Sequence, residues 1–199
     1  MVAGPTGSGK TRWTFTYLKL LQNLYEVPPR KILYCYGVYQ DLFEDMEREL
    51  PHFSLHRGLP TTEDVEQFAS GQHDLIVLDD LMQDVLGSKT AELLFTQGCH
   101  HKKISVVFIT QNIYGKGRSA RTIALNCWYM ILFKNIRGMS QIKTLEYQLG
   151  KSKTLTVAFE DATQRPFGYL MIDLTPRGHD EYRLRTNVLF EDDIVVYKS

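Results

Sequence analysis

The stretch that most limits what this chain can fold into lies within its first eleven residues. Gly4, Gly9, Lys10 and Thr11 satisfy the pattern G-x-x-x-x-G-K-[ST] in GPTGSGKT. Glycines at these spacings let backbone N–H groups turn inward around phosphate oxygens, and a helix that begins at the end of the loop directs its positive end at the same anion. The pattern predicts a nucleotide-binding loop that consists of Gly4, Pro5, Thr6, Gly7, Ser8, Gly9, Lys10 and Thr11.

The last two residues of this loop have separate expected roles. Lys10 would be catalytic and reach the β- and γ-phosphates, whereas the hydroxyl of Thr11 would ligate Mg²⁺. A helix should begin near Lys10 and continue through the run TRWTFTYLKLLQNL. The expected cofactors are therefore ATP and Mg²⁺.

A pair of acidic residues follows an apolar run in LIVLDD. A buried strand of this kind can deliver a carboxylate beside the phosphate loop. Asp79 would hold Mg²⁺, and Asp80, which should point to the other side of the strand end, could polarise the attacking water as a general base. The alternative is an acidic pair that only caps a strand before a loop.

A third polar residue stands at the end of VVFITQN. A strand inserted between the strands of the two motifs is the layout of the additional-strand NTPases, in which a polar tip can contact the γ-phosphate and the water. Gln111 is the predicted sensor, with a merely polar strand end as the alternative.

Apolar periodicity predicts strands that alternate with helices along most of the chain. The expected strands cover 31–37, 73–82, 104–112, 127–135, 167–176 and 182–190, and the expected helices cover 39–50, 61–69 with Thr62 as N-cap, 88–99, 119–125, 139–150 and 154–162. This order is typical of an α/β P-loop NTPase of the additional-strand, RecA-like type, with a mostly parallel sheet, helices on both faces and a C-terminal antiparallel hairpin.

Length favours a single P-loop ATPase domain over residues 1–199. Only three residues precede Gly4, fewer than the five or six of an ordinary strand, which predicts a truncated N-terminal strand. No apolar run approaches the roughly 20 residues that cross a bilayer, and no signal pattern is present. An intracellular protein without a membrane partner is expected.

Charge is unevenly distributed although the net charge is zero. Between His100 and Lys153, ten Lys and Arg residues stand against one acidic residue, Glu146. Such a block is typical of a nucleic-acid footprint, or else of a solvated basic face. Lys116 and Arg118, in the loop NIYGKGRSAR after the sensor strand, are the candidate DNA-binding residues.

Cysteine usage points to reduced, partly buried thiols, because the chain has three cysteines, each in or beside an apolar segment. Cys99 with His100 and His101 could form half of a zinc site, but no second pair with ligand spacing completes it.

The motifs together resemble a known family. GPTGSGKT, LIVLDD and VVFITQN, followed by a helix and NCWYMILFKN, resemble the FtsK/HerA superfamily of DNA-pumping ATPases. LFTQGCHHKKISVVFITQN, SARTIALNCWYMILFKNIR and EDATQRPFGYLMIDLTP are similar to its viral genome-packaging branch, the Polinton/Maverick (adintovirus) and poxvirus-type packaging ATPases. The resemblance implies a homo-oligomeric ring ATPase that translocates double-stranded DNA into a viral or virus-like capsid. It also implies capsid proteins as partners, and action in the host nucleus or cytoplasm where virions assemble.

An arginine finger is also implied by the resemblance. Arg118, Arg121 and Arg137 are candidates, of which Arg121 is preferred. The sequence departs from the family at Asp80, where superfamily members often carry Glu.

Three other functions use part of the same sequence pattern. A helicase or replication-associated NTPase has these loops, but neither further helicase motifs nor a second RecA-like domain is found. A small-molecule kinase would need a lid and an acceptor pocket. An inactive nucleotide-binding adaptor is disfavoured because every expected catalytic position is filled.

Overall fold

The computed structural model groups the chain into two compact units. The first contains Met1–Lys10, Gln111–Tyr114 and Cys127–Ser199, and the second contains Thr11–Thr110 and Gly115–Asn126. The structure describes residues 1–85, 88, 90–91, 94–95, 103–115, 118–150, 154–189 and 193–198. The chain passes from one unit to the other directly after Lys10. The single domain expected for residues 1–199 remains a prediction.

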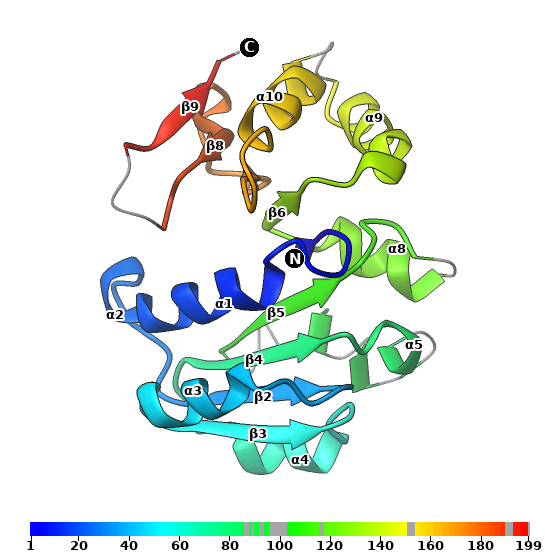
Figure 1. Cartoon of the computed structure of the whole chain (residues 1–199). Helices are drawn as coiled ribbons and strands as arrows, with labels where there is room; N and C mark the ends of the chain where they lie inside the picture. Colours follow the sequence, from blue (N-terminus) through cyan, green and yellow to red (C-terminus); the bar gives the residue numbers. More distant parts are fainter. Residues whose placement is uncertain are drawn as a thin grey trace. The chain divides into compact units, whose positions relative to one another are not determined.

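The second unit is built on parallel strands. They are β2 (Ile32–Tyr36), β3 (Phe53–Arg57), β4 (Asp74–Asp79) and β5 (Ile104–Thr110), in the order β3-β2-β4-β5. All three pairings are parallel, and Figure 1 shows the four arrows pointing the same way. Every residue of β4 is buried, as expected for a continuous apolar run with a strand on each side. The carboxyl end of β4 therefore lies between the ends of β2 and β5.

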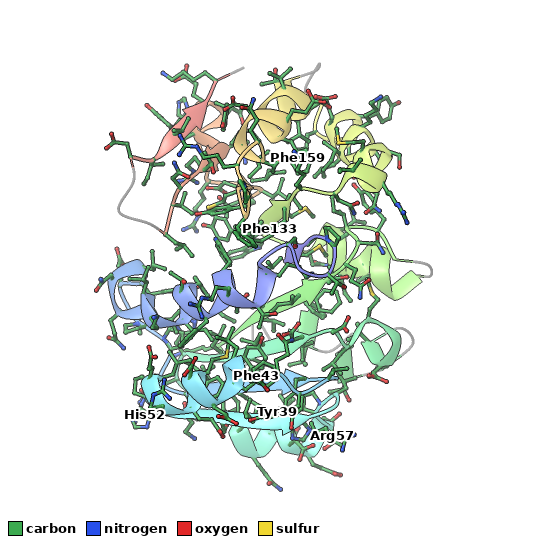
Figure 2. All side chains as sticks on the ribbon, in the orientation of Figure 1. Tyr39, Phe43, His52, Arg57, Phe133 and Phe159 are labelled. Atoms are coloured by element: carbon green, nitrogen blue, oxygen red, sulfur yellow. The ribbon has the colours of Figure 1, made fainter. Side chains whose placement is uncertain are left out.

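Helices pack on both faces of these strands. Phe43, labelled in Figure 2, belongs to α3 (Leu42–Glu49). The centroid of its ring lies 5.1 Å from that of the Tyr34 ring. Cys35 is the next residue of β2 and must face the other way. Burial raises the pKa of the Cys35 thiol to about 12, and the charge of Asp64 in α4 (Thr62–Phe68) adds to this shift. α3 and α4 therefore cover opposite faces, which confirms the predicted layering.

Four further helices can be assigned, wholly or largely, within the described residues of the second unit. They are α1 (Lys10–Lys19), α2 (Leu21–Leu24), α5 (Met82–Val85) and α8 (Arg118–Leu125). The helix predicted over 88–99 lies mostly outside the described residues. α1 begins at Lys10, as the phosphate-loop pattern predicts.

The first unit has a mixed arrangement. Its strands, in the order β1-β6-β7-β8-β9, are β1 (Val2–Ala3), β6 (Tyr129–Phe133), β7 (Tyr169–Asp173), β8 (Leu184–Thr186) and β9 (Val195–Tyr197). β1 pairs with β6 in parallel, whereas the remaining pairings are antiparallel. The predicted hairpin of β7 and β8 is confirmed, and β9 extends it. The described helices of this unit are α9 (Met139–Gln148), α10 (Thr154–Ala162) and the 3-10 helices η2 (Ile136–Gly138) and η3 (Asp180–Tyr182). Phe159 of α10 is buried in the core of the unit.

The α/β fold class is confirmed, but three local details differ from expectation. β3 and β9 were not predicted. The N-cap of α4 is Thr61 and not Thr62, because the Thr61 hydroxyl accepts from the Asp64 backbone while the Asp64 carboxylate accepts from the Thr61 backbone. Within the described residues, no helix is long and apolar enough to cross a membrane.

Candidate nucleotide-binding site

The phosphate loop is a tightly packed turn. A Cβ atom on Gly4 would lie 2.7 Å from Cβ of Phe133 in β6 and 2.8 Å from Oγ of Ser8, so only glycine fits. Gly9 adopts a φ of +99°, which L side chains rarely adopt, and the helix starts at the next residue. The buried Oγ of Ser8 has no hydrogen-bond partner within the described part of the chain. The loop thus leads directly into a helix N-terminus, which favours a bound anion.

Lys10 is held against the loop that precedes it. Its Nζ donates hydrogen bonds to the carbonyl oxygens of Gly4, at 2.7 Å, and Pro5, at 2.9 Å. The positive charge therefore lies at the loop, where the pattern predicts the β- and γ-phosphates.

Thr11 and Asp79, the two predicted metal ligands, come together in the second unit. The hydroxyl of Thr11 lies 3.5 Å from Oδ2 of Asp79, at the end of β4. Asp79 is only 4 % exposed. Among the described residues, no cluster of three His, Cys, Asp or Glu side chains could hold a metal by itself. A hydroxyl with one carboxylate does fit the partial oxygen set that Mg²⁺ takes alongside substrate phosphates and water.

Tyr34 is a site residue that the sequence did not reveal. Its hydroxyl donates a 2.7 Å hydrogen bond to the same Oδ2 atom of Asp79 from the fully buried interior of β2. Burial raises the pKa of Tyr34 well above its ordinary value, and the negative charge of Asp79 raises it further. The phenol therefore stays a neutral donor and orients the carboxylate. In KILYCYG, a tyrosine within a buried apolar run predicts only core packing.

Replacing Tyr34 by phenylalanine should destabilise the protein without leaving a cavity. The change removes a hydrogen bond to a charged acceptor, so we expect the free energy of unfolding to fall by about 1.5–3 kcal/mol in urea titrations. Tyr36→Phe is the matched control, because Tyr36 lies on the same face of β2 and its hydroxyl has no hydrogen bond within the described structure. Equal losses in the two variants would remove Tyr34 from this role.

Asp80 differs from its neighbour Asp79 in both exposure and backbone. It is exposed and adopts a φ of +56°, in the left-handed region. The backbone nitrogen of Asp80 lies 3.4 Å from the carbonyl oxygen of Ile109. A Cβ atom on Gly37 would lie 3.0 Å from the carbonyl oxygen of Asp80. Asp tolerates the left-handed region better than most residues because its short side chain can bond locally. This conformation gives a physical reason for an aspartate at position 80.

Gln111, the predicted sensor, belongs to the first unit and is exposed. It lines a small cavity of about 20 Å³ together with Ala3 and Gly4, at the start of the phosphate loop. Gln141 of α9 fixes the following segment, because its Oε1 accepts from the Ile113 backbone at 2.8 Å. The predicted sensor therefore stands beside the phosphate loop, although its role remains a prediction.

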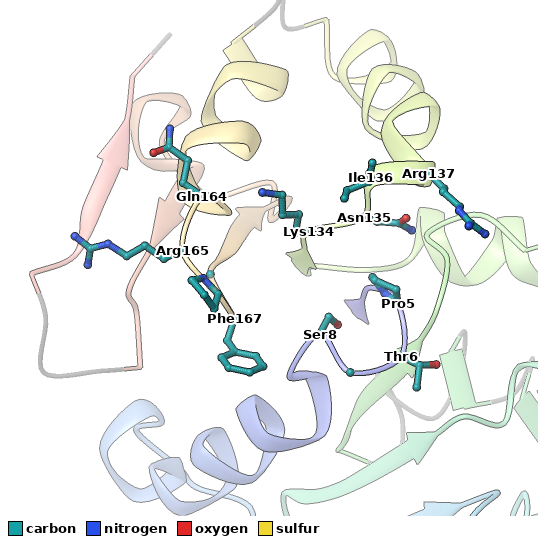
Figure 3. Close-up of a pocket in the computed structure, with 13 residues that line it drawn as sticks. Pro5, Thr6, Ser8, Lys134, Asn135, Ile136, Arg137, Gln164, Arg165 and Phe167 are labelled. Carbon is teal, nitrogen blue, oxygen red and sulfur yellow. The ribbon is translucent and has the colours of Figure 1, made fainter.

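The basic candidates are only partly visible. Lys116 lies outside the described residues, as do Cys99, His100 and His101. Arg118 and Arg121 belong to α8, but their side chains are not described. Arg137 is exposed and lines a cavity that also contains Pro5 and Thr6 of the phosphate loop (Figure 3). The preferred arginine finger, Arg121, stays a prediction.

Comparison with known proteins adds evidence on the fold. No protein-family model matches the sequence, and no curated protein matches it either. The DNA-packaging ATPase B204 from Sulfolobus turreted icosahedral virus matches with a TM-score of 0.61 at 10% identity, over 99% of this chain and 95% of that chain. This chain therefore shares the overall fold of that ATPase. The genome packaging NTPase B204 from Sulfolobus turreted icosahedral virus 2 also matches, in complex with AMPPCP (TM-score 0.57, 11% identity, 99% and 95% covered) and with ATP-gammaS (TM-score 0.55, 11% identity, 99% and 94% covered).

Proposed function

We propose that this chain is an ATP-driven double-stranded DNA translocase that packages a viral or virus-like genome into capsids. One observation carries the proposal. The phosphate loop is followed directly by Thr11, and the hydroxyl of Thr11 lies within 3.5 Å of the buried Asp79 carboxylate. This arrangement occurs in a fold that matches a DNA-packaging ATPase over 99% of the chain. The basic block between His100 and Lys153 suits a polyanionic track.

Hydrolysis would divide the work among four side chains. The Lys10 ammonium stabilises negative charge that develops on the phosphates. Thr11 and Asp79 would hold Mg²⁺, which when bound neutralises phosphate charge. Asp80, exposed beyond the strand, accepts the proton of the attacking water.

Three finer statements rest on sequence resemblance and belong to the proposal. The chain would fall near the Polinton/Maverick and poxvirus-type packaging ATPases, because the stretches around Gln111, Tyr129 and Gly168 resemble theirs. It would form a homo-oligomeric ring in which Arg121 reaches a neighbouring subunit's ATP. It would act at the site of virion assembly, in the host nucleus or cytoplasm, together with capsid proteins.

The deciding experiment is ATP turnover measured with and without duplex DNA. A translocase should hydrolyse ATP faster when the duplex is present, and free nucleosides should have no such effect. Stimulation by nucleosides with phosphorylated products would indicate a kinase instead. Absence of ATP turnover under both conditions would contradict the proposal.

The DNA side of the proposal is tested by a double variant, Lys116→Ala with Arg118→Ala. If both side chains contact phosphates, duplex binding weakens in the same way for every sequence, and each lost contact reduces the log–log salt slope by about one. Anisotropy titrations at several salt concentrations measure this slope. An unchanged slope would exclude this loop from the track and direct attention to Lys143, Lys151 and Lys153.

A further inference from the structure

The turn that follows α10 has an unusual residue at its most constrained position. The backbone N–H of Gly168 donates to the carbonyl of Arg165 at 3.0 Å, so residues 165–168 form a β-turn. Pro166 occupies the second position and Phe167 the third, with a φ of +63°. Proline followed by a positive φ is the pattern of a type II turn, whose third position is ordinarily glycine. A bulky aromatic residue there strains the backbone.

This strained residue does not contribute to the core. Phe167 is 69% exposed, whereas the aromatic residues Phe133, Phe159 and Tyr169 of the same unit are buried. The turn packs closely against the end of α10, because a Cβ on Gly168 would lie 2.4 Å from the carbonyl oxygen of Ala162. The fold therefore keeps an aromatic side chain exposed at a cost in backbone strain, which is typical of a functional position.

The ring stands beside the phosphate loop within the first unit. A Cβ on Gly9 would lie 3.0 Å from Cδ1 of Phe167. The ring borders a cavity of about 650 Å³ that is lined by residues 5–8, 134–137 and 164–168 (Figure 3). This volume is within the range of ordinary small-molecule sites. Three of its described lining residues, Lys134, Arg137 and Arg165, are basic and none is acidic.

We infer that this cavity is the nucleoside subsite, in which the base of ATP stacks on Phe167. The inference rests on the proposed function. A triphosphate held by the loop has one covalent continuation, through ribose to the base, and the cavity is the open space that begins at loop residues 5–8. Every nucleobase has a π-face that an aromatic ring can stack on. The basic rim complements the charge at the α-phosphate, and the closely packed turn limits the ordering cost of binding.

Phe167→Gly separates this role from a structural one. Glycine suits the third position of a type II turn, so the melting temperature should not fall. The affinity for a non-hydrolysable ATP analogue, measured by calorimetry, should fall about 10-fold with the loss of one stacking contact. Affinity for inorganic tripolyphosphate, which has no base, should stay the same. Phe167→Trp should retain analogue binding.

Tyr147→Ala is the matched control, because Tyr147 is an exposed aromatic residue of the same unit, 88% exposed on α9, that does not line the cavity. It should bind both ligands like the wild type. If Phe167→Gly binds the ATP analogue as tightly as the wild type does, the inference is wrong. It is also wrong if the affinity for tripolyphosphate falls by the same factor, because the substitution would then act on the phosphate loop. A wild-type protein that binds neither ligand would overturn the proposed function as well.

Discussion

Lys10→Ala should abolish ATP hydrolysis, with a loss in turnover on the order of 10²–10³-fold or more. The Lys10 ammonium already lies at the loop, bonded to the carbonyls of Gly4 and Pro5. Negative charge that develops on the phosphates would lose this stabilisation, and nucleotide binding should weaken as well. Phosphate release under saturating ATP measures the effect on turnover.

Lys19→Ala is the control for this substitution. Lys19 lies in the last turn of the same helix, where its Nζ is 3.4 Å from Glu49 and its side chain is 46% exposed. Removing an exposed charge pair costs little stability, and this one is remote from the loop, so turnover should be retained. A Lys10→Ala protein that hydrolyses ATP like the Lys19→Ala protein would refute the site assignment.

Asp80→Asn should still bind Mg·ATP but hydrolyse it at least about 10²-fold more slowly, since a general base contributes this much or more. Asparagine is a fair replacement because it also tolerates the left-handed backbone of residue 80, at φ +56°. Asp79→Asn should impair binding and turnover together, because Asp79 shares its Oδ2 atom between Thr11 and Tyr34.

Two measurements separate these roles: the affinity for Mg·ATPγS and the single-turnover rate of ATP. If Asp79 binds the metal and Asp80 activates the water, the affinity for Mg·ATPγS should be lower in Asp79→Asn than in Asp80→Asn. If Asp79→Asn and Asp80→Asn bind equally and turn over equally, the two carboxylates do not have distinct functions.

The positions of helices and strands could be predicted from the sequence where a local motif or apolar pattern was strong. The apolar run before Asp79 and the glycine-rich loop before Lys10 predicted a buried strand and a helix start, and both are present. β3 was missed because its residues, FSLHR, are polar at three positions and none of them is fully buried. The cap of α4 was misplaced by one residue because the first of two threonines, and not the second, has an acidic residue three positions later.

The site was harder to predict where it depends on distant contacts. Thr11, Asp79 and Gln111 could be proposed because each belongs to a short motif with a mechanism. Tyr34 could not, since its partner Asp79 is 45 residues away and only strand pairing brings them together. Phe167 carried no such signal, because proline, a bulky residue and glycine in succession indicate an ordinary type I turn with glycine at its fourth position, and the positive φ of Phe167 is visible only in the structure.

The close approach of Gly37 to Asp80 has an evolutionary consequence. A Cβ atom at position 37 would lie only 3.0 Å from the carbonyl oxygen of residue 80, and residue 80 already adopts the left-handed backbone conformation. A substitution at either position therefore changes which amino acids the other position can accommodate. In homologues that keep this backbone, glycine at 37 should therefore co-occur with Asp, Asn or Gly at 80.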